Sequence, residues 1–441
     1  MEIKQFYDEG LAHLSYAIIN NKEIVLVDPA RNPQPYYDFA EANDAKIMAV
    51  IETHPHADFV SSHLEIHHTT GASIYVSELV GADYPHVPFD EGETIRVGDI
   101  SLHAINTPGH SPDSISVLLI DANGDQKALF TGDTLLVGDV GRPDLRGNNI
   151  AEAQALAKSL YHSTREKIAT LSPEVIVYPA HGPGSLCGKN IGSALESTIA
   201  KELEENAALQ EMTEEQFVQF ITEDQPWIPK YFQYNVALNK RGAEPFEQGI
   251  RAATDMMHVE NLIENILIVD TRTAEDFRAG HHPNAINIPD NLKFETWLGS
   301  VVAPSESFYL IGYDKDSLHE IMEKVAKIGY EKFVNGLLWT ETGSKTEDIF
   351  NQDTFEKDTS QYTVLDVRND SELKSGKIFE NSVHIPLPRL RESLNALPVD
   401  KNIVVHCAGG LRSAIGSSIL SAKLDGIQIW DMGTNIKKYS N

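Results

Sequence analysis

Cysteine is scarce in this chain, because only two of its 441 residues are cysteines, Cys187 and Cys407. They are far apart in the sequence, and we expect them to lie in different domains. A framework of disulfide bonds is therefore excluded. Each thiol must serve either packing or chemistry of its own.

Positive charge and long apolar runs are also in short supply. The chain has 36 basic and 65 acidic side chains, a formal net charge of −29, which repels phosphate backbones and anionic membrane surfaces. No apolar run approaches the length that spans a bilayer, and residues 1–8 contain neither the basic nor the apolar region of a signal peptide. We therefore expect a cytoplasmic protein with no nucleic-acid and no membrane partner.

The most informative stretch is residues 53–59, which follow the apolar run 47–51. This stretch places His54, His56 and Asp58 just beyond a predicted buried strand, where metal ligands are commonly presented. Taken alone, it also fits a polar loop in which Asp58 caps the next segment.

Three further fragments repeat the pattern of a strand-like run that ends in a metal-ligating side chain. They are His110 after residues 101–105, Asp133 after residues 127–130, and His181 after residues 175–178. Four strand ends of this kind predict a metal centre.

The first 210 residues otherwise alternate predicted strands with predicted helices. Two strands, residues 14–19 and 23–27, form a hairpin that we expect to open the domain. Apolar residues at helical spacing predict helices over residues 35–43, 60–68, 150–168 and 190–209. Paired strands covered by helices suggest an αββα sandwich.

The order of the metal-ligating residues resembles the metallo-beta-lactamase superfamily over residues 1 to about 210. Members of that superfamily usually have His directly after the aspartate of the first motif, as a ligand of a second metal, whereas this chain has Phe59. Because an apolar ring cannot coordinate, a two-zinc hydrolytic site becomes doubtful. Two imidazoles and one carboxylate around a single ion favour non-haem Fe(II) and oxygen chemistry.

Residues 132–144 and 180–189 are similar to the persulfide dioxygenase branch of that superfamily. The resemblance implies a low-molecular-weight thiol persulfide and O₂ as substrates, sulfite as product, and one Fe(II) per chain. It implies that the iron ligands are His54, His110 and Asp133. It leaves three residues to orient the ligands and water, namely His56, Asp58 and His181.

Two residues near this predicted centre each admit two interpretations. The planar guanidinium of Arg142 either holds the anionic part of the substrate or forms an ion pair with Asp139 or Asp144. Cys187, six residues beyond His181, either packs as a buried thiol or reaches the iron pocket.

Residues 213–249 form a predicted connector packed on the first domain. Residues 216–221 have helical spacing, and the prolines in residues 225–229 end it. Tyr231 and Phe232 either wall the substrate entrance or, as we expect, pack in the interior.

The last 190 residues contain an internal duplication. Residues 269–272 recur as 365–368 and Gly280 recurs as Gly376, at a spacing near 96 residues. A repeat of this length is a duplicated domain, and each copy alternates strands with amphipathic helices, as in a small α/β domain with a parallel sheet. The two copies resemble rhodanese domains.

The copies differ where chemistry would occur. In the second, the predicted strand 402–406 leads directly into a loop and helix start composed of Cys407, Ala408, Gly409, Gly410, Leu411 and Arg412. A cysteine facing a helix N-terminus is favoured as a thiolate. The loop resembles the sulfur-binding active loop of rhodaneses, with a phosphatase as the lesser alternative for a Cys-x5-Arg pattern. The first copy has neither Cys nor Arg over the corresponding residues 310–316 and is expected to be inert.

The sequence thus predicts a multidomain α/β and α+β protein. We expect an αββα sandwich with its connector over residues 1–250, an inert rhodanese-like domain over 255–345, and a rhodanese domain over 350–441. The leading hypothesis is a homo-oligomeric persulfide dioxygenase whose sulfite is converted to thiosulfate at Cys407. The alternatives are a glyoxalase II-like thioester hydrolase, against which Phe59 argues, and a non-catalytic docking scaffold, against which Cys407 and Arg412 argue.

Overall fold

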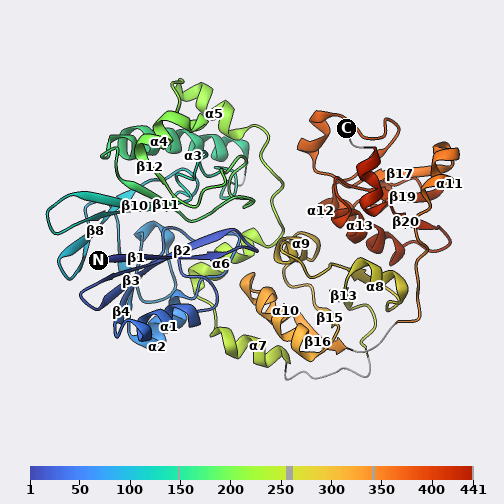
Figure 1. The fold of residues 1–441 in the computed structure, drawn as a ribbon, viewed down its shortest axis with the longest axis horizontal. Helices are drawn as coiled ribbons and strands as arrows, with labels where there is room; N and C mark the ends of the chain where they lie inside the picture. The colour runs from blue at the N-terminus through green and yellow to red at the C-terminus, as the bar shows by residue number, and fades with distance from the viewer. Residues whose placement is uncertain (148, 255–261, 340–342, 440–441) are drawn as a thin grey trace. The chain divides into compact units, whose positions relative to one another are not determined.

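The computed structural model describes residues 1–147, 149–254, 262–339 and 343–439 (Figure 1). The chain forms two compact units, Met1–Gln248 with Ala326–Gly329, and Gly249–Val325 with Tyr330–Asn441, and each is considered by itself. Residue 255, the predicted start of the first rhodanese-like domain, lies outside the described residues, as does residue 441.

Two six-stranded sheets form the centre of the first unit. The first sheet has the order β1-β2-β3-β4-β5-β6, with bounds Glu2–Asp8, His13–Asn20, Glu23–Val27, Lys46–Ile51, Ser73–Val76 and Val87–Pro88. The second has the order β12-β11-β10-β9-β8-β7, with bounds Ser197–Thr198, Ile176–Pro179, Gln126–Gly132, Ile115–Ile120, Ile100–Asn106 and Thr94–Val97. Buried side chains of both sheets, among them Tyr16 and Phe130, form one apolar core between them.

Helices cover the outer face of each sheet (Figure 1). Helices α1 (Gln34–Ala42) and α2 (His63–Thr70) cover the first sheet. The second sheet is covered by α3 (Ile150–His162), α4 (Ile199–Glu205) and α5 (Glu214–Thr222). The predicted αββα sandwich is therefore confirmed.

Three details of the first unit differ from the sequence-based prediction. Strand β1 precedes the predicted hairpin and pairs antiparallel with β2, so the hairpin does not open the domain. The helix predicted over residues 190–209 is confirmed only from Ile199, because Ser197 and Thr198 pair with β11. The Thr198 side chain then accepts a hydrogen bond from the backbone of Lys201, which starts α4 only there.

The third difference is in the predicted connector, residues 213–249, where α6 (Phe232–Arg241) was not foreseen, nor was the start of α7 (Phe246–Thr254), which continues into the second unit. Tyr231 and Phe232 are 1% and 0% exposed, so they pack in the interior as expected. Among the described residues, no helix is long and apolar enough to cross a membrane.

The second unit holds two copies of one fold, each with a parallel four-stranded sheet. The first copy comprises β13 (Leu267–Asp270), α8 (Ala274–Ala279), β14 (Ala285–Asn287), α9 (Phe294–Val301), β15 (Phe308–Gly312), α10 (Lys315–Lys327) and β16 (Val334–Trp339). The second comprises α11 (Gln352–Lys357), β17 (Tyr362–Asp366), β18 (Val383–His384), α12 (Leu387–Leu390), β19 (Asn402–His406), α13 (Leu411–Ser421) and β20 (Ile429–Asp431). Sheet orders β14-β13-β15-β16 and β18-β17-β19-β20 confirm the duplication.

The repeated Asp-x-Arg pattern serves structure in both copies. Nη2 of Arg272 donates to Asp270 Oδ2 at 2.6 Å and to the Gly280 carbonyl at 2.9 Å. In the second copy, the equivalent bonds of Arg368 measure 2.7 Å and 3.2 Å. These buried bidentate pairs tie the first strand of each copy to its first helical segment.

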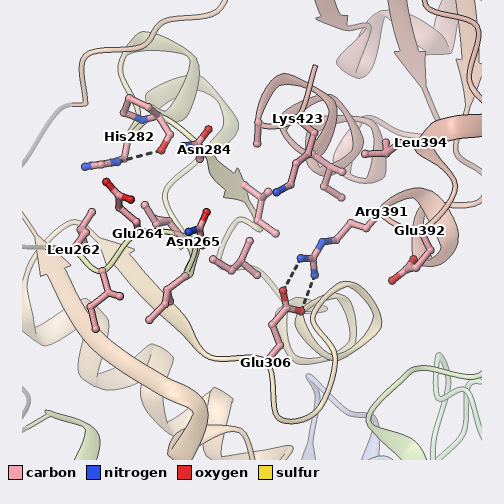
Figure 2. Close-up of a pocket in the computed structure, with 18 residues that line it drawn as sticks. Leu262, Glu264, Asn265, His282, Asn284, Glu306, Arg391, Glu392, Leu394 and Lys423 are labelled. Carbon is pink, nitrogen blue, oxygen red and sulfur yellow. Dashed lines mark hydrogen bonds and ion pairs between the residues drawn. The ribbon is translucent and has the colours of Figure 1, made fainter. Parts of the chain in front are cut away.

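The two copies are joined by polar contacts within the second unit. The amide of Asn287 donates to Ser418 Oγ at 2.8 Å, and Arg391 forms a bidentate pair with Glu306 at 2.6 and 2.9 Å. The pair lies at the wall of a cavity of about 610 Å³, which the Lys423 side chain also lines. Figure 2 shows Arg391 and Glu306 pointing toward each other. Polar side chains of the two copies therefore contact each other within the second unit.

Candidate metal centre and cysteine loop

The four predicted strand ends meet at one edge of the sandwich. His54 follows β4, His110 follows β8, Asp133 follows β10 and His181 follows β11. A bulge in the pairing of β10 with β11, between Phe130 and Gly132, redirects the chain immediately before Asp133. The predicted gathering of these side chains is present in the structure.

His54, His110 and Asp133 converge through one atom each. Asp133 Oδ2 lies 3.8 Å from His54 Nε2 and 3.5 Å from His110 Nε2, and all three side chains are at most 2% exposed. Within the described residues, Asp133 Oδ2 has no hydrogen-bond partner. A buried carboxylate oxygen without a partner, facing two imidazole nitrogens, fits a divalent cation.

A buried hydrogen-bond chain fixes the orientation of His54. Thr53 Oγ1 donates to Asp28 Oδ2 at 2.8 Å, so it accepts from His54 Nδ1 at 3.0 Å and leaves Nε2 with its lone pair toward Asp133. Burial, together with the neighbouring His56, lowers the pKa of His54 well below its usual value. The imidazole is therefore neutral, as a metal ligand must be.

Asp28 was missed by the sequence analysis, although a signal for it existed. It directly follows β3, the parallel neighbour of β4, and therefore obeys the same strand-end rule that located the other residues. Its second oxygen accepts from the Thr53 amide at 2.7 Å and lies 3.1 Å from His56 Nε2. Asp28 thus orients both histidines of the first motif.

His181 lies between two carboxylates. Its Nδ1 is 2.6 Å from Asp133 Oδ1, and its Nε2 is 2.7 Å from Asp58 Oδ2. Burial alone would lower the pKa of His181, but the charges of Asp133 and Asp58 raise it well above its usual value. Through Nδ1, His181 orients Asp133 and leaves Oδ2 of that carboxylate to face the two imidazoles.

A second group of possible ligands lies beside the first. Ligand atoms of His56, Asp58 and His181 are all within 4.8 Å of one another and are buried. Phe59 packs against His56 with ring centroids 4.4 Å apart. Two interpretations rest on this cluster. The sequence predicts that the three residues orient the ligands, and the alternative is that they hold a second cation.

His13 is a further residue at the centre that sequence analysis did not single out. It is 1% exposed, and its ring packs on Phe59 with centroids 3.7 Å apart. Within the described part of the chain, its Nε2 has no hydrogen-bond partner. No sequence signal marks His13, because it comes from the first residue of β2 and not from the end of a strand.

Two glycines allow the backbone to approach the ligands closely. A Cβ on Gly141 would lie 2.0 Å from the Asp133 carbonyl oxygen and 2.8 Å from His110 Nδ1. Gly132 has φ +52°, and a Cβ there would lie 2.5 Å from Thr53 Oγ1. Side chains at either position would displace the ligand set.

Arg142 is engaged by protein groups in the structure. Its guanidinium forms a bidentate pair with Asp144, at 2.7 Å for each bond, and donates to the Leu186 carbonyl at 3.2 Å. Of the two interpretations, the geometry therefore shows the ion pair. This pair fixes the loop that carries Cys187, since the Arg142 amide also donates to the Cys187 carbonyl at 2.8 Å.

Cys187 lies at the metal centre. Its Sγ is within 4.8 Å of ligand atoms of Asp133 and His181, and the side chain is 1% exposed. Burial raises the pKa of the Cys187 thiol, and Asp58 and Asp133 raise it further, so the thiol is protonated.

Cys407 lies between β19 and α13, as predicted. Its Sγ accepts a hydrogen bond from the Gly410 amide at 3.1 Å and lies 3.7 Å from Ser413 Oγ. Gly410, with φ +107°, is the N-cap of α13, so the sulfur faces the start of that helix. Ala408, Gly409 and Leu411 complete the loop around it.

Arg412 is held beside the loop by a carboxylate. It forms a bidentate pair with Glu372, with Nη2 2.9 Å from Oε1 and Nη1 also bonded to Oε2. Glu372 is fixed in turn, because its side chain accepts from the Asn369 amide at 2.9 Å. The ion pair with Glu372 therefore holds Arg412 in a defined position beside the cysteine loop.

Known proteins resemble both parts of the chain. The metallo-beta-lactamase superfamily profile matches residues 8–181, and the rhodanese-like domain profile matches residues 254–335 and 351–440. Human mitochondrial persulfide dioxygenase ETHE1 is 33% identical over 163 residues, which are 36% of this chain and 59% of the human protein. The chain thus spans about three fifths of that relative's length.

Two more comparisons extend over longer stretches. A probable metallo-hydrolase of Burkholderia pseudomallei is 27% identical over 57% of this chain and 97% of its own length. A crystal structure of a metallo-beta-lactamase from Staphylococcus aureus is 30% identical, with a TM-score of 0.69 over 77% of this chain and 99% of that one. The chain therefore belongs to the metallo-beta-lactamase superfamily and carries two rhodanese-like domains after its metallo-beta-lactamase domain.

Proposed function

We propose that the protein is an iron-dependent persulfide dioxygenase whose cysteine loop converts the sulfite product to thiosulfate. The observation that carries the proposal is the convergence of His54 Nε2, His110 Nε2 and Asp133 Oδ2 on one buried point. Two imidazoles and one carboxylate, with other positions open, suit non-haem Fe(II). The similarity to the human persulfide dioxygenase supplies the substrate class.

The ion would be held by His54, His110 and Asp133. Iron bound there supplies the electron chemistry by which O₂ oxidises the outer sulfur of a thiol persulfide to sulfite. The chain's own part is to keep the three ligands in place through Thr53 and His181 and to enclose the site with the apolar ring of Phe59.

The sulfur-transfer step belongs to Cys407. Its thiolate attacks the outer sulfur of a second persulfide, the S–S bond to the carrier breaks, and the carrier leaves as a thiol. Sulfite then attacks the outer sulfur on Cys407, which yields thiosulfate and returns the thiolate. The Gly410 amide donates to Sγ at 3.1 Å and so positions the sulfur that makes this attack.

A second candidate function is a two-metal thioester hydrolase. The cluster of His56, Asp58 and His181 favours it, as does the similarity to a probable metallo-hydrolase. Phe59 stands where two-metal members of the superfamily usually have a further histidine ligand, and its ring packs on His56 with centroids 4.4 Å apart. We therefore rank the hydrolase below the dioxygenase.

Product analysis of Cys407→Ser protein tests the coupled reaction. Oxygen uptake with a low-molecular-weight persulfide should persist at a rate near that of the wild type, while the product shifts from thiosulfate to sulfite. The measurement is the amount of both anions after complete turnover, with non-enzymatic thiosulfate subtracted. A mutant that forms thiosulfate at the wild-type ratio would show that Cys407 does not carry the sulfur.

A further inference from the structure

The first rhodanese-like copy contacts the region directly behind the cysteine loop of the second. Arg278, on α8 of the first copy, extends to Asp431 at the end of β20, with Nη1 and Oδ2 3.6 Å apart. The Arg278 side chain is 28% exposed and that of Asp431 only 5%. The inert copy thus places a cation beside a buried carboxylate of the active copy.

Asp431 lies beside the cysteine loop. Its Oδ1 accepts a hydrogen bond from the Gly433 amide at 2.8 Å, and Ser413 is close enough to lower the pKa of its carboxyl. Ser413 Oγ donates to the Gly410 carbonyl at 3.0 Å and lies 3.7 Å from Cys407 Sγ. Ser413 therefore lies between Asp431 and the reactive sulfur.

The turn after Asp431 also packs on the loop. A Cβ on Gly410 would lie 3.0 Å from the Gly433 carbonyl carbon and 3.1 Å from the Thr434 amide nitrogen. The same Gly410 donates its amide to Cys407 Sγ at 3.1 Å. Because the turn leaves no space at this contact, any movement of Asp431 is transmitted to the amide that faces the sulfur.

Several charged groups surround this contact. Burial raises the pKa of Asp431, whereas Ser413, Gly433 and Arg278 oppose that rise. Burial also raises the pKa of Glu347. The charge of Asp431 raises this pKa further, whereas the charges of Lys345 and Arg278 lower it. Arg278 is thus a cation whose charge acts on both of these buried carboxyl groups.

We propose that Arg278 of the first copy is a positioning residue for sulfur transfer, acting through Asp431 and Ser413 on the Cys407 loop. The inert copy would then be a working part of the active site and not only a spacer. The inference rests on the proposed sulfur transfer at Cys407. The contacts between Arg278 and the cysteine loop do not involve the metal centre.

The test compares Arg278→Met and Arg278→Lys in the full-length protein. A matched control is Lys324→Met, since Lys324 pairs with Asp290 inside the first copy and is 30% exposed. Two quantities are measured for each variant: kcat and KM for sulfur transfer from a persulfide, and the rate at which iodoacetamide alkylates Cys407. Peptide mass spectrometry measures alkylation of Cys407, and Cys187, which is buried to the same extent, is the internal reference.

Arg278→Met should slow alkylation of Cys407 and lower kcat by roughly 3- to 30-fold, the range in which neighbouring side chains couple. KM should stay near its wild-type value, Arg278→Lys should restore most of both rates, and Lys324→Met should match the wild type. Wild-type rates in Arg278→Met, or equal losses in Arg278→Lys, would overturn the proposal.

Asp431→Asn is the second variant, in case Arg278→Met does not fold. It keeps an acceptor for the Gly433 amide but removes the ion pair, so it should show the same slowing. An unaffected rate would refute the inference. If wild-type protein transfers no sulfur while Arg278→Met still slows alkylation, the proposed function fails and the positioning role stands.

Discussion

Replacing Thr53 by valine tests how the metal centre is held. Valine preserves the branched shape but removes the hydroxyl that donates to Asp28 at 2.8 Å and accepts from His54 at 3.0 Å. His54 would then lose the group that keeps its Nδ1 protonated and its Nε2 free for the ion. The variant thus changes the orientation of His54 while the His54 ligand itself is kept.

The expected magnitude follows from these two bonds. A buried Asp28 oxygen left without its hydroxyl partner costs about 1–3 kcal/mol of folding free energy. Loss of a partner that orients a ligand lowers metal affinity by roughly 10- to 100-fold. Thr53 is 1% exposed, so water cannot replace the hydroxyl without rearrangement of the core.

The assay is Fe(II) titration against a competing chelator, together with urea unfolding of the metal-free protein. Thr164→Val is the matched control, because Thr164 is 0% exposed and its hydroxyl makes contacts at 2.8, 3.1 and 3.2 Å to groups other than the ligands. Thr53→Val should weaken Fe(II) binding, and the control should not. Unchanged affinity in Thr53→Val would refute the argument that this hydroxyl fixes the ligand.

Three further predictions concern the ligands, the cysteine loop and acid stability. Gly141→Ala should lower both iron content and melting temperature, since its Cβ would lie 2.0 Å from the Asp133 carbonyl oxygen, and both are read by metal analysis and calorimetry. Arg412→Lys, which cannot keep the bidentate contact with Glu372, should lower sulfur-transfer kcat/KM roughly tenfold and leave oxygen uptake unchanged. Burial lowers the pKa of His406 from 6.5 to about 4, so stability is lost as pH falls through that window, by about 3 kcal/mol. Hydrogen exchange of β19 measures the free energy of unfolding at each pH. Between pH 7 and 4 this free energy should fall less in His406→Gln than in the wild type, by the same amount. An equal fall in both proteins would contradict the prediction.

The ligands that directly follow buried strands could be predicted from the sequence. His54, His110, Asp133 and His181 each follow a buried strand, and apolar runs identify such strands without tertiary information. The duplicated copies were equally visible, because their Asp-x-Arg pairs make the same buried bonds in both. The cysteine loop followed from the strand that ends at His406.

Contacts between segments that are far apart in the sequence could not be predicted from it. His13 reaches Phe59 only because β2 lies beside the loop of the first motif, and nothing in its local sequence marks it. The partner of Arg142 was left open between two aspartates, and only the folded loop selects Asp144. The contact of Arg278 with Asp431 depends on how the two copies pack, which neither copy encodes alone.

Metal analysis combined with oxygen uptake tests the central claim most directly. The protein is expressed with iron and zinc both available, and the purified chain is assayed with a thiol persulfide and with a thioester. The account predicts about one Fe per chain, O₂ consumption with the persulfide, and loss of that activity in His54→Ala, His110→Ala and Asp133→Ala. Two Zn per chain, with thioester hydrolysis and no oxygen uptake, would contradict it.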